Sequence, residues 1–254
     1  MLEESLNQYL EEKIVVMPIM LAKGLEFDVE FHDIEELNAG VLQALPDVSK
    51  ISCAVLPAIA ERYRLLDSGA ALGRGNGPLL VRRKGEQTSL KHIAVPGEHT
   101  TANALVARLF PEIEERTPML FSEIAAAVER GDFDGGVLIH EGRFVYERRN
   151  LELVADLGLE WEARTQLPLP LGGIVVKRDL PQEVQQRVER VLRRSIEYAF
   201  ANPMTSRDFV KQHAQELEDD VIDKHIALFV NDYSLSLGAE GRAAMTTLTG
   251  LQEL

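Results

Sequence analysis

A histidine directly after an apolar run is the residue of this sequence best suited to acid–base chemistry. His140 follows Val-Leu-Ile at residues 137–139 and precedes Glu141 and Arg143. The apolar run predicts a buried strand, and open α/β sheets bind their ligands at the carboxyl ends of strands. Because the pKa of histidine lies near neutrality, His140 could take up and return a proton at physiological pH. A structural histidine, bonded to a loop carbonyl, fits this position equally well.

A second candidate site lies at residues 94–102, Ala-Val-Pro-Gly-Glu-His-Thr-Thr-Ala, which pass from a strand through a tight turn into a helix. The first backbone N–H groups of a helix have no partner within it, and the helix dipole favours negative charge there. The segment therefore predicts an anion site for a small ligand that carries a carboxylate. Thr100 and Thr101 also fit a helix N-cap without any ligand, so both interpretations stay open.

Two motif-like stretches predict turns rather than sites. Residues 73–77, Gly-Arg-Gly-Asn-Gly, lack the spacing of either phosphate-binding fingerprint and lead into a strand. We expect a turn that brings backbone close to the cleft or to a neighbouring strand, with Arg74 solvated. Residues 132–135, Asp-Phe-Asp-Gly, begin like a calcium loop but become apolar where oxygen ligands are needed, which favours a plain loop between helix and strand.

The other reactive residues indicate no metal and no cofactor. The 6 histidines show no metal-ligand spacing. Cys53, in an expected strand, lacks the basic neighbours of a nucleophile, and we interpret it as a small core residue. Trp161 is expected to pack in a loop or a cleft wall.

Strands and helices in alternation are needed to position these candidates. Bounded apolar runs predict strands at residues 51–56, 78–81, 92–95, 136–139 and 173–176, and an apolar–acidic alternation predicts one at 25–31. Helical spacing predicts helices at residues 103–110, 120–130 and 181–200, with two or three more between 206 and 254. Strands that alternate with helices imply a mainly parallel α/β sheet.

Two stretches are the expected crossings between two lobes. They are the polar residues 82–90 and the neighbourhood of residues 168–173. If both cross, residues 1–84 and 175–254 form a discontinuous larger lobe, and residues 88–173 form an inserted smaller lobe. A cleft between two lobes is a favoured place for small ligands.

The composition limits the partners of the chain. With 27 basic and 41 acidic residues the net charge is −14, which repels a phosphate backbone, so nucleic acid is not expected, although a local basic pocket could hold a small anion. The single cysteine excludes a disulfide framework within the chain. The acidic start and the short apolar run at residues 14–22 fit neither a secretory signal nor a membrane span. We expect a cytoplasmic protein that binds no membrane.

Five stretches, in wording and order, resemble the 1,4-dihydroxy-6-naphthoate synthase family of the futalosine route to menaquinone. They are Val-Ser-Lys-Ile-Ser at 48–52, Ser-Gly-Ala-Ala-Leu-Gly-Arg-Gly-Asn-Gly-Pro-Leu at 68–79, Val-Pro-Gly-Glu-His-Thr-Thr-Ala at 95–102, Ile-His-Glu-Gly-Arg-Phe at 139–144 and Leu-Pro-Leu-Pro-Leu-Gly at 167–172. The resemblance extends from residue 24 to about residue 240. Several matches in the right order are far more specific than any one of them.

The resemblance implies a two-lobed α/β fold with a central cleft, like the type II periplasmic binding proteins. It also implies a lyase of menaquinone biosynthesis that acts on cyclic dehypoxanthinylfutalosine, with His140 as the base that starts ring cleavage. The implied substrate-binding residues lie on both lobes: Lys50, Ile51 and Ser52 on one, Thr101 and Ala102 on the other. The carboxylate of this substrate agrees with the anion site expected at the helix start.

The chain departs from the family at its start. The family begins with a strand and a Ser-Pro-Cys-Pro-Asn-Asp-Thr-like loop near the cleft, whereas residues 1–23 contain nothing like it. Because a replaced first strand would remove part of the cleft wall, a non-catalytic cytoplasmic module that binds a small carboxylate is one alternative. Chemistry like that of chorismate dehydratase, in the same pathway, is another, although the wording at residues 139–143 and 167–172 fits it less well.

Overall fold

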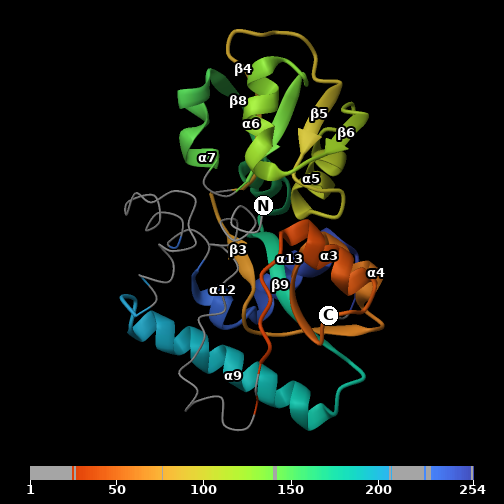
Figure 1. Cartoon of the computed structure of the whole chain (residues 1–254), viewed down its shortest axis with the longest axis vertical. Coiled ribbons are helices and arrows are strands. Elements are labelled where there is room, and N and C mark those ends of the chain that lie inside the picture. The colour runs from red at the N-terminus through yellow and green to blue at the C-terminus, as the bar shows by residue number, and fades with distance from the viewer. Residues whose placement is uncertain are drawn as a thin grey trace.

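The structure is a computed structural model that describes residues 25, 27–75, 77–139, 142–205, 207, 226, 230–252 and 254. Two of the sequence-based predictions, the catalytic His140 and the departure at residues 1–23, therefore lie outside the described residues. The described elements form two sheets, each with its own helices, stacked along the long axis of the molecule (Figure 1).

The first sheet is built around its longest strand, β9 (Leu169–Lys177). β9 pairs antiparallel with β1 (Val48–Ser52), β2 (Tyr63–Leu65) and β3 (Ala71–Gly73). Alternate residues of β9 face opposite sides, as the period of two in a strand requires. Val175 packs in the cluster that contains Met245 of α13 (Gly238–Thr249), whereas Ile174 packs in the cluster that contains Leu192 of α9 (Gln182–Ala201). This sheet is therefore covered on both faces.

Helices of three different segments complete the first lobe. They are α3 (Ile34–Leu42), α4 (Leu56–Ile59), which follows the 3₁₀ turn η3 (Cys53–Val55), and α12 (Asp232–Leu235), beside α9 and α13. α3 begins at a capping box, in which Asp33 and Glu36 each accept a backbone N–H of the other. This capping box fixes the start of α3, which carries Glu35 and Asn38 towards the other lobe.

The second sheet has the strand order β6-β5-β7-β4-β8. Its strands are β4 (Leu79–Arg83), β5 (His92–Val95), β6 (Glu115–Pro118), β7 (Gly135–Leu138) and β8 (Leu151–Asp156). One face packs against α5 (Thr101–Leu109) and α8 (Leu157–Thr165), the other against α6 (Phe121–Arg130), with α7 (Gly142–Val145) and the 3₁₀ turn η4 (Tyr146–Arg149) near β8. The second lobe is thus a separate layered unit with its own core.

Several sequence-based predictions of strands and helices hold, and three predictions of strands and of their arrangement are wrong. The helices expected at residues 103–110, 120–130 and 181–200 are confirmed as α5, α6 and α9. The strand expected at residues 25–31 is absent from the described part of that segment, since residues 27–30 are all exposed and the alternation has no covered face. The strand expected at 51–56 is instead β1, and Cys53 lies in η3.

The mainly parallel arrangement is the third wrong prediction. Among the described strands, five pairings are antiparallel and two, of β5 with β6 and with β7, are parallel. The physical reason is that β4 and β9 run back along their neighbours after crossing between the lobes. Alternation of strands and helices in a sequence does not reveal such reversals.

Sheet membership changes at two short segments. β3 belongs to the first sheet and β4 to the second, so the chain crosses near residues 74–78, and it returns between α8 and β9 near residues 166–168. Residues 84–91 join two strands of one sheet. The lobe limits of 1–84 with 175–254 and of 88–173 stay a prediction, and we propose to place them at these two crossings instead.

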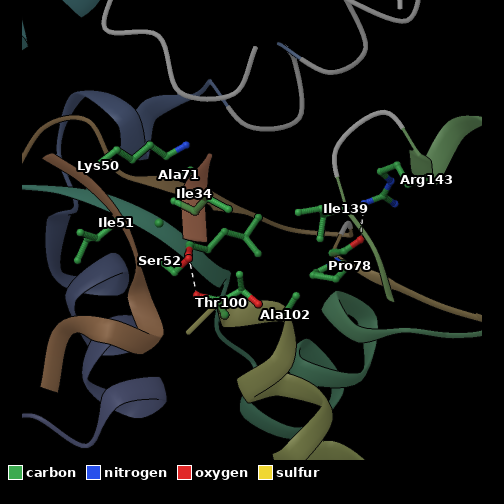
Figure 2. Close-up of a pocket in the computed structure, with 14 residues that line it drawn as sticks. Ile34, Lys50, Ile51, Ser52, Ala71, Pro78, Thr100, Ala102, Ile139 and Arg143 are labelled. Carbon is green, nitrogen blue, oxygen red and sulfur yellow. Dashed lines mark hydrogen bonds between the residues drawn. The ribbon is translucent and has the colours of Figure 1, made fainter. Parts of the chain in front are cut away.

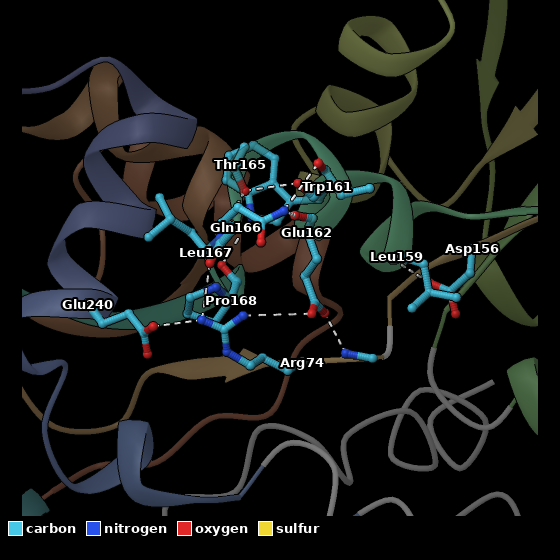
Figure 3. Close-up of polar contacts among 12 residues, drawn as sticks. Arg74, Asp156, Leu159, Trp161, Glu162, Thr165, Gln166, Leu167, Pro168 and Glu240 are labelled. Atoms are coloured by element: carbon cyan, nitrogen blue, oxygen red, sulfur yellow. Dashed lines mark hydrogen bonds and ion pairs between the residues drawn. The ribbon is translucent and has the colours of Figure 1, made fainter.

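Arg74 ties the two crossings together (Figure 3). Its guanidinium pairs with Glu240 of α13 at 2.6 Å and lies 3.8 Å from a carboxylate oxygen of Glu162 of α8, and it donates to the carbonyl of Gln166 at 3.3 Å. The hydrogen bond with Glu240 raises the pKa of Arg74 above its ordinary value. The sequence-based expectation of a solvated Arg74 is therefore wrong, because Arg74 links both lobes.

Gly77 is a test of how tightly the first crossing packs. A Cβ atom at this position would lie 2.3 Å from the backbone nitrogen of Gly158, so the turn approaches helix α8 and not a neighbouring strand. We expect Gly77→Ala to lower the free energy of unfolding by about 1–3 kcal/mol, because backbone would have to move. Gly40→Ala, within α3, is the matched control. A Cβ atom at Gly40 would lie 3.7 Å from its nearest neighbour, so this variant should be neutral or slightly stabilising. Urea denaturation measures both, and equal stability of the two variants would contradict this packing.

Candidate functional site

A pocket of about 640 Å³ lies where the two lobes meet (Figure 2). It is open to solvent, and that volume includes part of the opening. Its lining comes from α3 and the first sheet, from the first crossing, and from the start of α5 and the end of β7. The lining residues are Ile34, Lys50, Ile51, Ser52, Ala71, Gly77, Pro78, Thr100, Thr101, Ala102, Ile139, Arg143, Leu171 and Gly172.

The five residues predicted to bind substrate all line this one pocket. Lys50, Ile51 and Ser52 end β1 in the first lobe, while Thr101 and Ala102 begin α5 in the second. Ala54 and Thr101 are 47 positions apart in sequence. In the fold, the backbone N–H of Ala54 lies 3.4 Å from the Thr101 hydroxyl. The two halves of the predicted set thus face one another across the cleft, and their roles stay a prediction.

The surroundings of His140 can be described although the residue itself lies outside the described part of the chain. β7 ends at Leu138, and the next residue, Ile139, lines the pocket. On the other side, Arg143 in the first turn of α7 lines it as well. The chain therefore touches the pocket both before and after His140. Its role as a base stays a prediction.

The start of α5 combines a cap with unpaired amides. Thr100 is the N-cap, as the alternative interpretation predicted: its hydroxyl accepts the backbone N–H of Asn103 at 3.3 Å and donates to the carbonyl of Gly97 at 2.9 Å. The Thr101 hydroxyl donates to the carbonyl of Leu171 at 2.7 Å. Within the described residues no acceptor is recorded for the backbone N–H groups of Thr101 and Ala102, which a helix leaves without partners. Capping and anion binding can therefore coexist here.

The described lining of the pocket carries basic but no acidic side chains, although the whole chain has a net charge of −14. Its 14 described lining residues include Lys50 and Arg143 and no Asp or Glu. Arg143 donates to the carbonyl of Gly77 at 2.9 Å and pairs with the largely buried Asp156 at 3.3 Å. Asp156 in turn accepts the backbone N–H groups of Gly158 and Leu159 at the start of α8. These basic side chains fit the predicted site for a small anion, since local charge decides the field inside a cleft.

Two residues that contact the site were not found from the sequence. Glu35 and Asn38 project from α3, a helix that the hydrophobic pattern did not indicate. Asn38 is fully buried and bonds to both the backbone and the side chain of Ser52. Asp33 and Glu36, three positions apart, were the available signal for this helix, because they match a capping box.

The remaining candidates of the sequence have structural roles. Cys53 is buried, and burial raises the pKa of its thiol well above the usual range, which confirms a core residue. Trp161 is 1 % exposed and its Nε1 donates to the carbonyl of Pro168 at 3.1 Å. Asp134, in the loop between α6 and β7, accepts the backbone N–H groups of Lys91 and His92, which lowers its pKa. These contacts are packing and capping.

Metal and membrane sites were also sought in the described residues. No group of three or more His, Cys, Asp or Glu side chains among them is arranged to hold a metal ion. No helix in the described part of the chain is both long and apolar enough to cross a membrane.

The chain is similar to known proteins over most of its length. Residues 7–253 match the family described as menaquinone biosynthesis. The chain is 42 % identical to a 1,4-dihydroxy-6-naphthoate synthase of Thermus thermophilus, over 92 % of this chain and 84 % of that protein. It is 40 % identical to the enzyme of the same name from Streptomyces coelicolor, over 87 % of this chain and 80 % of that protein.

Solved structures place the fold. A crystal structure of a protein from Archaeoglobus fulgidus superposes with a TM-score of 0.87 at 33 % identity, covering 94 % of this chain and 91 % of that one. A Candida albicans protein with the generic periplasmic binding protein fold superposes with a TM-score of 0.63 at 11 % identity, covering 95 % and 89 %. The two-lobed fold like that of periplasmic binding proteins is therefore confirmed.

Proposed function

Because the chain belongs to the menaquinone biosynthesis family, we propose that it is a lyase, a 1,4-dihydroxy-6-naphthoate synthase that acts on cyclic dehypoxanthinylfutalosine in the cytoplasm. The observation that carries this proposal is the pocket between the lobes. It gathers Lys50–Ser52 and Thr101–Ala102, the residues that the family resemblance assigns to substrate binding, around one cleft.

The substrate carboxylate binds at the start of α5. The backbone N–H groups of Thr101 and Ala102, which have no acceptor among the described residues, donate to it, and the helix dipole adds to the attraction. Lys50, on the opposite lobe, contributes a positive charge to the same cleft. A substrate held from both lobes is fixed in position and orientation, which is itself a large part of catalysis.

His140 acts as the base in this proposal. A base must lie within reach of the proton that it removes, and Ile139 and Arg143 on either side of it line the pocket.

Turnover of defined substrates tests this function. The purified protein is incubated separately with cyclic dehypoxanthinylfutalosine and with chorismate, and products are followed by mass spectrometry. We expect 1,4-dihydroxy-6-naphthoate from the first and no change in the second. Conversion of chorismate would favour the dehydratase alternative. Calorimetric binding of cyclic dehypoxanthinylfutalosine without any product would favour a non-catalytic carboxylate-binding module.

Lys50→Gln is expected to weaken substrate binding. Loss of a charge-assisted hydrogen bond to an anionic ligand costs about 1.5–3 kcal/mol, which corresponds to about 10–150-fold in the dissociation constant. Isothermal titration calorimetry with the substrate measures this change. Lys91→Gln, at an exposed lysine outside the pocket lining, is the matched control and should bind like the wild type. Equal affinities of the two variants would remove Lys50 from the binding set.

A further inference from the structure

We propose that Glu35 and Asn38 of α3 are positioning residues, which hold the two lobes at the separation where the pocket accepts its substrate. They do so through hydrogen bonds that attach the turn before α5 to the first lobe. This inference rests on the proposed function, since it names what prepares the same pocket for binding.

Glu35 makes the first of these contacts between the lobes. Its carboxylate accepts the backbone N–H of His99 at 3.1 Å and lies 2.6 Å from Nδ1 of the same residue. His99 belongs to the turn between β5 and α5, in the second lobe, whereas α3 packs on β1 of the first lobe. A Cβ atom at Gly97 would lie 2.5 Å from the Glu35 carboxylate, so this glycine permits the close approach.

Asn38, one helical turn further along α3, makes the second contact between the lobes. Its side-chain oxygen accepts the backbone N–H of Ser52 at 2.9 Å. Its side-chain nitrogen donates to the Ser52 hydroxyl at 3.0 Å and to the carbonyl of His99 at 3.4 Å. One fully buried amide thus joins a predicted substrate-binding residue of the first lobe to the turn of the second lobe.

The contacts of Glu35 and Asn38 lie directly beside the predicted binding groups. His99 immediately precedes Thr100, the cap of α5, and Thr101 and Ala102 follow it. Any opening of the lobes that breaks the contacts of Glu35 and Asn38 would therefore move the α5 amides away from Ser52. Ile34, next to Glu35 on the same helix, lines the pocket itself.

This arrangement predicts which kinetic constant responds. If the contacts of Glu35 and Asn38 are lost, a smaller fraction of the protein has the lobes in the binding geometry. The apparent affinity for the substrate then falls in proportion to that fraction. Bound substrate still selects the closed form, so the rate at saturation changes little. A purely structural role would instead lower kcat through the unfolded fraction and leave KM unchanged.

Glu35→Gln and Glu36→Gln form the decisive pair. Glu35→Gln removes the negative charge beside His99 and replaces one of the two acceptor oxygens with an NH₂ group that cannot accept the backbone N–H. The neighbouring Glu36 is exposed, caps α3 through a bond that glutamine retains, and lies 3.5 Å from His32 in the same lobe. With cyclic dehypoxanthinylfutalosine we expect KM to rise about tenfold in Glu35→Gln with kcat within about twofold, and Glu36→Gln to match the wild type. Asn38→Ala should show the same split, with a lower melting temperature as well. An unchanged KM in both Glu35→Gln and Asn38→Ala would overturn the proposal.

A distance measurement separates this inference from the proposed function. Spin labels are placed at Glu61→Cys and Glu129→Cys, which are exposed sites on different lobes; the native Cys53 is buried. Double electron–electron resonance should give one narrow distance in the wild type and in Glu36→Gln, and a longer, broader distribution in Glu35→Gln and Asn38→Ala. Identical distributions in all four proteins would overturn the positioning role. If the distances change while no protein turns over substrate, the function fails and the positioning role stands.

Discussion

His140→Ala is expected to lower kcat with cyclic dehypoxanthinylfutalosine by about 10²–10⁴-fold, the usual contribution of a general base. Substrate affinity should change little, because the predicted binding groups at Lys50–Ser52 and Thr101–Ala102 are untouched. Single-turnover kinetics with mass spectrometric detection measures the chemical step, and calorimetry measures binding.

His32→Ala is the matched control for this variant. His32 is exposed, lies outside the pocket lining and contacts Glu30 and Glu36, so its loss should leave kcat unchanged. Added imidazole should restore part of the rate of His140→Ala, since a small base can occupy the space left by the side chain. A His140→Ala variant with the kcat of the wild type would remove this residue from the base role.

Trp161→Ala is expected to lower the free energy of unfolding by about 3–5 kcal/mol, the range for truncation of a buried aromatic residue. Trp161 is 1 % exposed and packs in the core of the second lobe with Leu157 and Leu169. Its Nε1 donates to the carbonyl of Pro168, at the second crossing between the lobes, and the Arg108 guanidinium lies 5.7 Å from its ring centre. The loss therefore combines a cavity, a buried unpaired carbonyl and a ring contact.

Trp161→Phe separates these contributions. Phenylalanine keeps much of the packing but donates no hydrogen bond, so we expect a smaller loss, about 1–3 kcal/mol, from the unpaired Pro168 carbonyl. Guanidinium denaturation followed by circular dichroism measures both variants. If alanine costs no more than phenylalanine, the side chain does not have the packing role that its burial indicates.

Local patterns predicted α5, α6 and α9 and several buried strands, because these depend on neighbours in sequence, but they missed α3 and α8. The helix at residues 181–200 has a strong period and a proline at its start, and α9 agrees with it to within one residue at each end. The apolar run before His140 likewise became β7, covered on both faces. The residues of the pocket, by contrast, were found through family resemblance rather than through their own pattern.

Features that depend on distant partners were not predictable in this way. The antiparallel pairing of β4 with β7 and β8 is set by where the chain crosses between lobes, which no local period encodes. Arg74 looked like a solvated residue because its partners Glu162 and Glu240 are far away in sequence. Asn38 looks like any polar helix residue until the fold places Ser52 and His99 beside it.

The central claim is that the pocket between the lobes binds cyclic dehypoxanthinylfutalosine with its carboxylate at the start of α5. A crystal structure of His140→Asn with this substrate tests it most directly, because the variant should bind without turnover. We predict that the carboxylate accepts hydrogen bonds from the backbone N–H groups of Thr101 and Ala102, with the remainder of the substrate between Ser52 and residue 140. Substrate bound elsewhere on the protein, or with its carboxylate turned away from α5, would contradict it.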